Sequence, residues 1–277
     1  MRTRRADATL VREVPATRRI MPYVMRGRNE SVVYFRQEVD LTRTEEFISS
    51  FNRANGGLKI TLFHLVVWAA ARVLDERPRL NRFVAGGRLW QRDGIWISFS
   101  AKKQLSDDAP IVAVKRRFDP DQPFRIMVKE MAEDVGAARS SDRSYTDREL
   151  DLLLRTPGVL LRGLTALQRG ADALGLLPRS YIENDPLYAS LFVANLGSLK
   201  MDAAYHHLWE YGNITIFCVI GRTYERPVVI DGKVTARRTA VLKYSFDERV
   251  EDGLYANAAL ERLREIVEDP LSGGADD

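Results

Sequence analysis

The sequence predicts a single α+β domain, and three observations support that fold class. Strand-like runs with a two-residue or continuous apolar pattern are mixed along the chain with helical segments. Turns centred on Asp93-Gly94 and Asp231-Gly232 are flanked by such runs, which predicts antiparallel hairpins. The 277 residues are 45% hydrophobic and contain no repeats or low-complexity linkers, so one large core is expected.

The first half of the chain predicts a loose N-terminal arm, residues 1–17, followed by a strand, two helices and a hairpin. Thr42 is expected to cap the first helix, with Glu45 completing a capping box. The second helix is apolar on most sides and therefore buried, and His64 within it is expected to be a satisfied core histidine. The predicted segments are a strand at 32–40, a helix that follows Thr42 and is ended by Asn55-Gly56-Gly57, a helix at 61–74, hairpin strands at 87–91 and 95–100, a strand at 111–115 and a helix at 123–138.

A polar loop at 139–150 precedes a leucine-rich helical region at 150–177, which is broken at Pro157-Gly158. Arg155, Arg162 and Arg169 are spaced seven apart, which places them on one helix face. The simplest interpretation is two helices packed over the core with the arginines outward. A partner or subunit surface and a membrane-contacting element remain alternatives.

The last third of the chain predicts the main sheet. Residues 192–197, 214–220 and 234–246 read as three strands of one sheet, and residues 252–268 as a closing helix. The folded domain is expected to span residues 18–270, with a disordered tail at 271–277.

Composition excludes several classes of protein. A net charge of +4 suits a polyanionic small-molecule ligand, but it is too small and too dispersed to indicate nucleic acid binding. The one cysteine, Cys218, lies in a strand-like run, so it predicts a core thiol and excludes an intrachain disulfide. No secretory signal and no membrane span are recognised, since the longest apolar stretch contains His64 and Arg72. We therefore expect a cytoplasmic protein.

Two motifs carry a resemblance to a known family. Asp247, Arg249, Asp252 and Gly253 fit the frame Asp-His-Arg-x-x-Asp-Gly, at a strand end that opens into a helix. The segment 192–197, Phe-Val-Ala-Asn-Leu-Gly, is similar to a strand that reads Phe-Thr-Ile-Ser-Asn-Leu-Gly in that family. The chain thus resembles, in order over roughly residues 18–270, the catalytic domain of the acyltransferase component of 2-oxo acid dehydrogenase complexes, and chloramphenicol acetyltransferase.

The resemblance implies a chloramphenicol acetyltransferase-like fold, with a mixed sheet and flanking helices. It implies a homotrimer with the active site between subunits, and acyl transfer to or from coenzyme A, with a histidine removing the proton of a thiol or hydroxyl acceptor. It further implies that Asp247, Arg249 and Gly253 hold the motif loop, and that the carboxylate at Asp252 pairs with an arginine. No lipoyl domain is expected before the catalytic domain.

Both catalytic side chains implied by the resemblance are replaced. The histidine falls on Glu248, and a serine that donates to the oxyanion falls on Ala194. A glutamate ordinarily has a pKa about four units below that of a thiol, so Glu248 needs strong burial to act as the base. The alternative is that Glu248 pairs with a neighbouring arginine.

His206-His207 offers a replacement imidazole, because the segment Tyr205–Tyr211 is expected near the subunit interface of the resembled fold. One of the two would act as base, oriented by Glu248 or Asp252. The alternative is a pair of packing histidines. A metal site is not expected, because adjacent histidines on a strand point apart and no third ligand is at hand.

Asn195 and Ser198 are candidate hydrogen-bond donors to substrate where Ala194 cannot act. Two functions remain open at this point. One is an acyltransferase that uses coenzyme A or a related thioester, and the other is a non-catalytic trimeric scaffold or acyl-thioester-binding protein.

Overall fold

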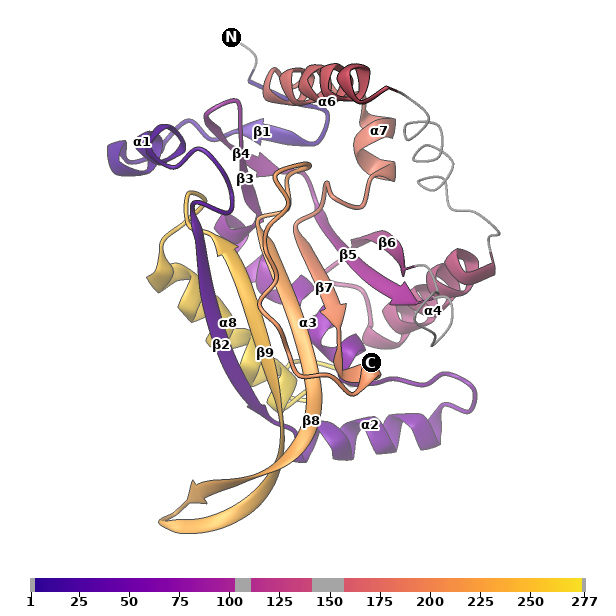
Figure 1. The fold of residues 1–277 in the computed structure, drawn as a ribbon. Coiled ribbons are helices and arrows are strands. Elements are labelled where there is room, and N and C mark those ends of the chain that lie inside the picture. Colours follow the sequence, from indigo (N-terminus) through magenta and orange to yellow (C-terminus); the bar gives the residue numbers. More distant parts are fainter. Residues whose placement is uncertain (1–2, 103–110, 141–156, 276–277) are drawn as a thin grey trace.

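The main sheet is mixed and has six strands. A computed structural model describes residues 3–102, 111–140 and 157–275, and in it the strand order is β2-β9-β8-β7-β5-β6 (Figure 1). β7 runs parallel to β5 and β8, and the other pairs are antiparallel. The strands are β2 (Val32–Asp40), β5 (Ile95–Lys102), β6 (Ile111–Phe118), β7 (Leu191–Asn195), β8 (Ile216–Ile230) and β9 (Lys233–Asp247).

Helices cover one face of this sheet and enclose the main core. They are α2 (Thr42–Ala54), α3 (Leu62–Glu76), α4 (Phe124–Ser140) and α8 (Gly253–Glu268). Helix α3 is buried along most of its length, as its apolar surface predicts. Cys218 on β8 lies in this core, and burial raises the pKa of its thiol to about 12, so it is a packing residue as predicted.

The other face of the sheet is covered by the extended segment that joins β7 to β8. Ala203, Leu208 and Ile214 of this segment pack on Phe217 and Val219 of β8. Side chains of successive residues point to opposite faces of a strand. Phe246 of β9 enters the main core, so its neighbours Ser245 and Asp247 lie on the second face.

The prediction of three strands in one sheet is confirmed, and so is the hairpin at Asp231-Gly232. Both turn residues have positive φ, 50° and 77°, as the tightest hairpin turns require. The predicted hairpin at Asp93-Gly94 is wrong. The strands on either side of that turn do not pair, because β4 joins a second sheet of order β1-β4-β3.

The second sheet is small and contains β1 (Ala8–Leu10), β3 (Arg82–Ala85) and β4 (Arg88–Arg92). Its hairpin turn is Gly86-Gly87, where both residues again have positive φ. The turn at Asp93-Gly94 instead carries the chain from the small sheet to the large one. Both turns have suitable residues, so the choice of partner depended on long-range packing.

The N-terminal arm was expected to be loose, but it is ordered against the small sheet. Ala8–Leu10 pairs with β4, and the guanidinium of Arg5 is buried between Asp7 (Nε to Oδ1, 2.9 Å) and Asp172 (2.5 Å). The arm continues into helix α1 (Ala16–Val24). The C-terminal residues also fold back further than expected, because Ala275 is buried. Residues 276–277 lie outside the described residues.

The leucine-rich region forms helix α6 (Gly158–Ala173), which starts at the predicted break. The expectation that it packs over the core is wrong for this helix, because none of its residues is buried. Residues 150–156, Arg155 among them, and the greater part of the predicted loop at 139–150 lie outside the described residues. The remaining elements are the helix α7 (Arg179–Asn184) and the short 3₁₀ helices η1 (Pro78–Asn81) and η2 (Gly197–Leu199).

The capping prediction was also placed at the wrong helix. Leu41 precedes α2, Thr42 donates its hydroxyl to Asp40 (2.6 Å), and Glu45 pairs with Arg238. The capping box lies at α3, where the backbone N–H of Thr61 donates to Nδ1 of His64 (3.1 Å). Burial lowers the pKa of His64 to about 4.

Candidate active site

The motif loop begins with a buried ion pair at the end of β9. The carboxylate of Asp247 is fully buried and accepts two hydrogen bonds from the guanidinium of Arg249, at 2.9 Å from Nε and 2.7 Å from Nη2. It also accepts from the backbone N–H of Arg249 (3.1 Å) and from the hydroxyl of Ser31 (3.0 Å). Both oxygens of this carboxylate are therefore used in holding the loop.

Arg249 extends the same network to the N-terminal part of the chain. Its Nη1 donates to the carbonyl oxygens of Met25 (3.2 Å) and Arg26 (3.0 Å). The connection between α1 and β2 is thus tied to the motif loop. The pair Asp247–Arg249 is almost fully buried and acts on position and stability.

Glu251 forms a second charge cluster that the sequence did not indicate. Its carboxylate is 8% exposed and lies 3.3 Å from Arg79, 3.7 Å from Arg18 and 3.8 Å from Arg82. The position has no fixed residue type in the motif frame, so pattern alone gave no signal. The cluster joins the loop to η1, β3 and α1.

Asp252 is the N-cap of α8, and its carboxylate accepts from the backbone N–H of Tyr255 (2.9 Å). The expected pairing of Asp252 with an arginine is not observed among the described residues, where Asp247 pairs with Arg249 and Glu251 with Arg79. Gly253 follows as the first residue of the helix. Asp252 therefore sets the start of α8.

Glu248 differs from the other acidic residues of the loop. Its backbone is fixed, since its N–H donates to the carbonyl of Ser31 (3.1 Å) and its carbonyl accepts from Arg18. Its half-buried carboxylate has no hydrogen bond or ion pair within the part of the chain that the structure describes. The alternative of a glutamate paired with a neighbouring arginine is not observed, since Arg18 contacts the carbonyl instead.

The two adjacent histidines present free imidazole nitrogens. Nδ1 of His206 lies 2.7 Å from the carbonyl of His207, and Nδ1 of His207 lies 3.3 Å from the carbonyl of Leu208. A carbonyl oxygen can only accept, so each Nδ1 carries the proton and each Nε2 is left as the basic nitrogen. No partner for either Nε2 is found in the described ranges.

Aromatic stacking fixes the ring of His206. It lies parallel to Phe217 of β8 at 3.9 Å between ring centroids, and at 4.6 Å from the ring of His207. The hydroxyl of Ser245 donates to the carbonyl of His206. Burial lowers the pKa of His206, which favours the neutral imidazole that a general base requires.

Asn195 and Ser198 line a cavity of about 490 Å³ between the end of β7 and the helices α2 and α3. Ser198 donates its backbone N–H to Oδ1 of Asn195 (3.2 Å) and its hydroxyl to the carbonyl of Asn195 (2.8 Å). A side chain at Gly197 would meet the carbonyl of Gly221 at 2.4 Å, so this close turn requires glycine. The cavity walls include Ile48 and Phe63.

One chain does not bring these groups together. Ala194 lies opposite Val219, which lies opposite Lys243, five residues before Glu248. At about 3.3 Å per residue, Glu248 is roughly 16 Å further along the sheet than Ala194. His206 contacts Ser245, about 10 Å along the strand from Glu248 by the same rise. Within the described residues, no hydrogen bond, ion pair or ring contact joins either histidine to Glu248 or Asp252.

The described residues contain no group of three or more His, Cys, Asp or Glu side chains arranged to hold a metal ion. In the same residues, no helix is long and apolar enough to cross a membrane.

Comparison with known proteins identifies the motif at residues 247–253. Residues 184–273 match the family model described as 2-oxoacid dehydrogenases acyltransferase (catalytic domain). This range contains both motifs noted in the sequence. Over this range the chain is similar to these acyltransferase catalytic domains. The resemblance predicted from the sequence is thereby confirmed.

Similarity to known proteins extends over nearly the whole chain. A lipoamide acyltransferase component of a branched-chain alpha-keto acid dehydrogenase complex, from Pseudomonas putida, is 25% identical over 96% of this chain and 54% of its own length. The chain thus spans about half the length of the curated relatives it matches.

The solved structures show the fold. A dihydrolipoamide acetyltransferase of Azotobacter vinelandii, solved to investigate the catalytic roles of a serine, a histidine and an asparagine, has a TM-score of 0.63 at 20% identity and covers 95% of this chain and 93% of that one. Chloramphenicol acetyltransferase has a TM-score of 0.55 at 12% identity, with coverage of 95% and 98%. The predicted chloramphenicol acetyltransferase-like α+β fold is confirmed.

Proposed function

We propose that this chain is an acyltransferase that moves an acyl group between coenzyme A and a thiol or hydroxyl acceptor, at a site completed between the subunits of a homotrimer. The proposal rests on the family of its relatives and above all on one observation. The cavity at Asn195 and Ser198 and the unpaired carboxylate of Glu248 are separated by roughly 16 Å or more along the sheet within one chain, which supports a site completed by a second subunit.

An exposed aromatic surface around the histidine pair supports the assembly. Tyr34, Tyr205 and Trp209 are each more than 40% exposed, and Met201 is 50% exposed. Exposed clusters of this kind are typical of protein interfaces. Light scattering at micromolar concentration should show a trimer, and a monomer would contradict this part of the proposal.

His206 or His207 is the proposed base. The imidazole Nε2 takes the proton of the acceptor thiol or hydroxyl as that atom attacks the thioester carbonyl. Collapse of the tetrahedral intermediate breaks the carbon–sulfur bond, and the imidazolium returns the proton to the departing coenzyme A thiolate. Imidazole is preferred because its ordinary pKa is about two units below that of a thiol, whereas that of a carboxylate is about four units below.

The remaining site residues have supporting roles in this proposal. Glu248, or Asp252 at the start of α8, is proposed to orient the imidazolium of a neighbouring subunit, since a carboxylate stabilises the cation formed during transfer. Asn195 and Ser198 are proposed to donate to the substrate or its oxyanion in place of the serine that Ala194 replaces. A cytoplasmic location belongs to the same proposal and is supported by the single buried cysteine.

The second candidate is a non-catalytic trimeric scaffold or acyl-thioester-binding protein of the same fold. Ala194 and Glu248 favour it, because alanine cannot donate to an oxyanion and a carboxylate is a weaker base than imidazole. It predicts that coenzyme A thioesters bind without turnover.

Turnover of acyl-coenzyme A by single variants separates these proposals. We expect His206→Gln or His207→Gln to lower kcat at least 100-fold with little change in the folded structure. Glu248→Gln should lower kcat less, by about tenfold, if it only orients the base. If both histidine variants keep full activity while Glu248→Gln is inactive, Glu248 is the base. If thioesters bind to the wild-type protein but no acyl donor is turned over, the scaffold function replaces the enzymatic one.

A further inference from the structure

Helix α6 turns a row of leucines away from the protein. Leu160, Leu164, Leu167 and Leu174 follow one another at intervals of four, three and seven residues, which places them on one face. All four are exposed, Leu167 by 71%, and Val159 and Leu176 near the two ends of the helix are exposed as well. A soluble surface rarely leaves a stripe of this length without a partner.

Polar contacts hold the opposite side of the helix. The guanidinium of Arg5 donates to the carbonyl and the carboxylate of Asp172, both at 2.5 Å, and Gln168 donates to the hydroxyl of Tyr188 (2.5 Å). The helix is therefore anchored in an orientation that keeps its leucines outward.

A second apolar row lies at the same end of the molecule, on α1. Ile20, Tyr23 and Val24 are 54–66% exposed. The hairpin turn of the small sheet connects the two rows. A side chain at Gly86 would meet the carbonyl of Ala173 in α6 at 2.3 Å, and one at Gly87 would meet the hydroxyl of Tyr23 at 3.3 Å. Figure 1 shows α1, β1 and α6 along this one end of the molecule.

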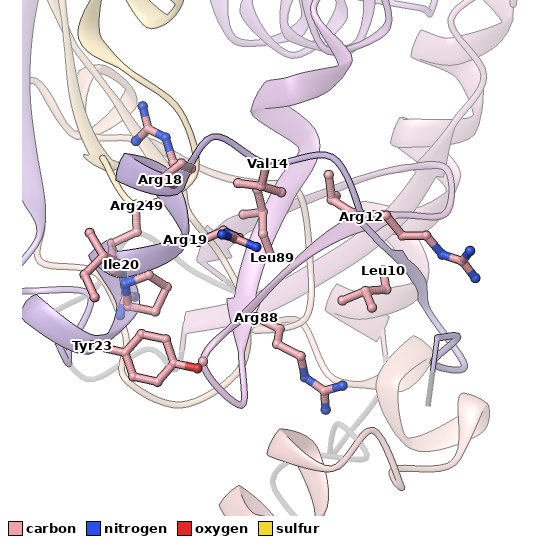
Figure 2. Close-up of a pocket in the computed structure, with 14 residues that line it drawn as sticks. Leu10, Arg12, Val14, Arg18, Arg19, Ile20, Tyr23, Arg88, Leu89 and Arg249 are labelled. Atoms are coloured by element: carbon pink, nitrogen blue, oxygen red, sulfur yellow. The ribbon is translucent and has the colours of Figure 1, made fainter. Parts of the chain in front are cut away.

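An arginine-lined depression of about 590 Å³ adjoins α1 and the turn (Figure 2). Its cationic lining residues are Arg12, Arg18, Arg19, Arg88 and Arg249. Its walls are apolar, with Leu10, Val14 and Leu89 among them, and no acidic side chain lines it.

Some arginines of the depression are not engaged in other interactions of the described residues. Arg18 and Arg249 are engaged with the motif loop. Arg12 and Arg19 have no hydrogen bond or ion pair from their side chains among the residues that the structure describes. Two uncompensated guanidinium groups above an apolar wall are suited to an anionic head group on an apolar chain.

We propose that this end of the molecule binds the surface of an anionic lipid membrane. The exposed side chains of α1 and α6 enter the boundary between head groups and acyl chains, and the arginine-lined depression binds lipid phosphate. The arrangement favours a membrane over a partner helix, because the apolar rows lie on two separate helices and a basic depression adjoins one of them. Interfacial helices combine the same two features, apolar burial and attraction to anionic lipids.

This surface reaches the candidate active site. Arg18 lines the depression and also donates to the carbonyl of Glu248. Membrane binding would therefore place the motif loop near the lipid surface. The proposal is independent of the proposed acyl transfer, since it concerns binding and needs no turnover.

The test is sedimentation of the full chain with vesicles of phosphatidylglycerol and phosphatidylcholine, compared with vesicles of phosphatidylcholine alone. We expect binding to the anionic vesicles at least tenfold tighter than to the neutral ones, and weakened by high salt. Arg12→Gln with Arg19→Gln should weaken anionic-vesicle binding about 30-fold, at about 1 kcal/mol for each charge. Leu164→Asp with Leu167→Asp should abolish binding.

The hairpin of β8 and β9 supplies a matched control. Val229 and Val234 are 72% and 75% exposed but lie on the projecting hairpin (Figure 1), away from this surface. Val229→Asp with Val234→Asp should leave vesicle binding unchanged. Circular dichroism and thermal unfolding of each variant establish that the fold is intact.

Several outcomes would overturn the proposal. They are absence of wild-type binding, equal binding to neutral vesicles, or equal losses in the leucine and valine variants. Binding of inorganic phosphate without vesicle binding would assign the depression to a free anion. Self-association that the leucine variant abolishes, again without vesicle binding, would make the row a contact between copies of this chain.

Discussion

The motif loop and the histidine segment differ in how their polar groups are used. In the loop at 247–253, Asp247, Arg249, Glu251 and Asp252 are all engaged within the protein, and Glu248 alone keeps a carboxylate without a partner among the described residues. In the segment Tyr205–Tyr211, both imidazoles use Nδ1, and neither Nε2 has a partner in the part of the chain that the structure describes. The difference shows that the other polar residues of the motif loop have structural roles. These roles do not depend on which residue occupies position 248.

The largest expected effect comes from breaking the buried pair in the loop. Arg249→Met leaves the fully buried carboxylate of Asp247 without its cation, so we expect a loss of about 3–5 kcal/mol in the free energy of unfolding, measured by urea denaturation. Combining it with Asp247→Asn should recover part of that loss.

The exposed pair Arg43–Asp269 provides the control for this prediction. Arg43 is 72% exposed, and solvent screens such pairs, so Arg43→Met should cost less than about 0.5 kcal/mol. Equal losses in Arg249→Met and Arg43→Met would show that the loop network is not a special source of stability.

The third histidine, His64, differs from His206 and His207 because it has a structural role. Its Nδ1 accepts from Thr61, and its pKa is lowered to about 4 from an ordinary value near 6.5. The unfolded chain therefore binds more protons between these two values, and stability falls as the pH is lowered from about 6.5 to 4. Since the ring is only partly buried, we expect a loss of about 1–2 kcal/mol from this group.

The measurement is the free energy of unfolding as a function of pH for the wild type and for His64→Gln. Glutamine can also close a capping box, so the variant should fold and show a flatter profile in this window. An unchanged profile in His64→Gln would assign the pH dependence to other groups.

A smaller effect is expected at the edge of the loop. Asp252→Ala removes the N-cap of α8 and should cost about 1 kcal/mol, whereas Asp252→Asn should be nearly neutral, because asparagine caps as well as aspartate. Thermal unfolding of both variants measures the difference. A large loss in Asp252→Asn would mean that the negative charge itself is needed.

The sequence was most informative where local chemistry decides structure. Positive φ at a two-residue turn needs residues such as Asp231-Gly232, and that hairpin was predicted correctly. The same signal at Asp93-Gly94 misled, because a turn motif fixes the local bend but not which strand lies beside the next. Glu251 gave no signal at all, since its three arginines come from distant parts of the chain.

By itself, the sequence determined the fold class, the three strands of the main sheet and the motif frame from Asp247 to Gly253. These depend on periodicity and on short-range hydrogen bonding, which a single segment contains. The tertiary structure decided that β4 pairs with β1 and β3, that the leucines of α6 face outward, and that Ala194 and Glu248 lie far apart in one chain. These outcomes depend on contacts between segments distant in sequence, whose energies no local pattern records.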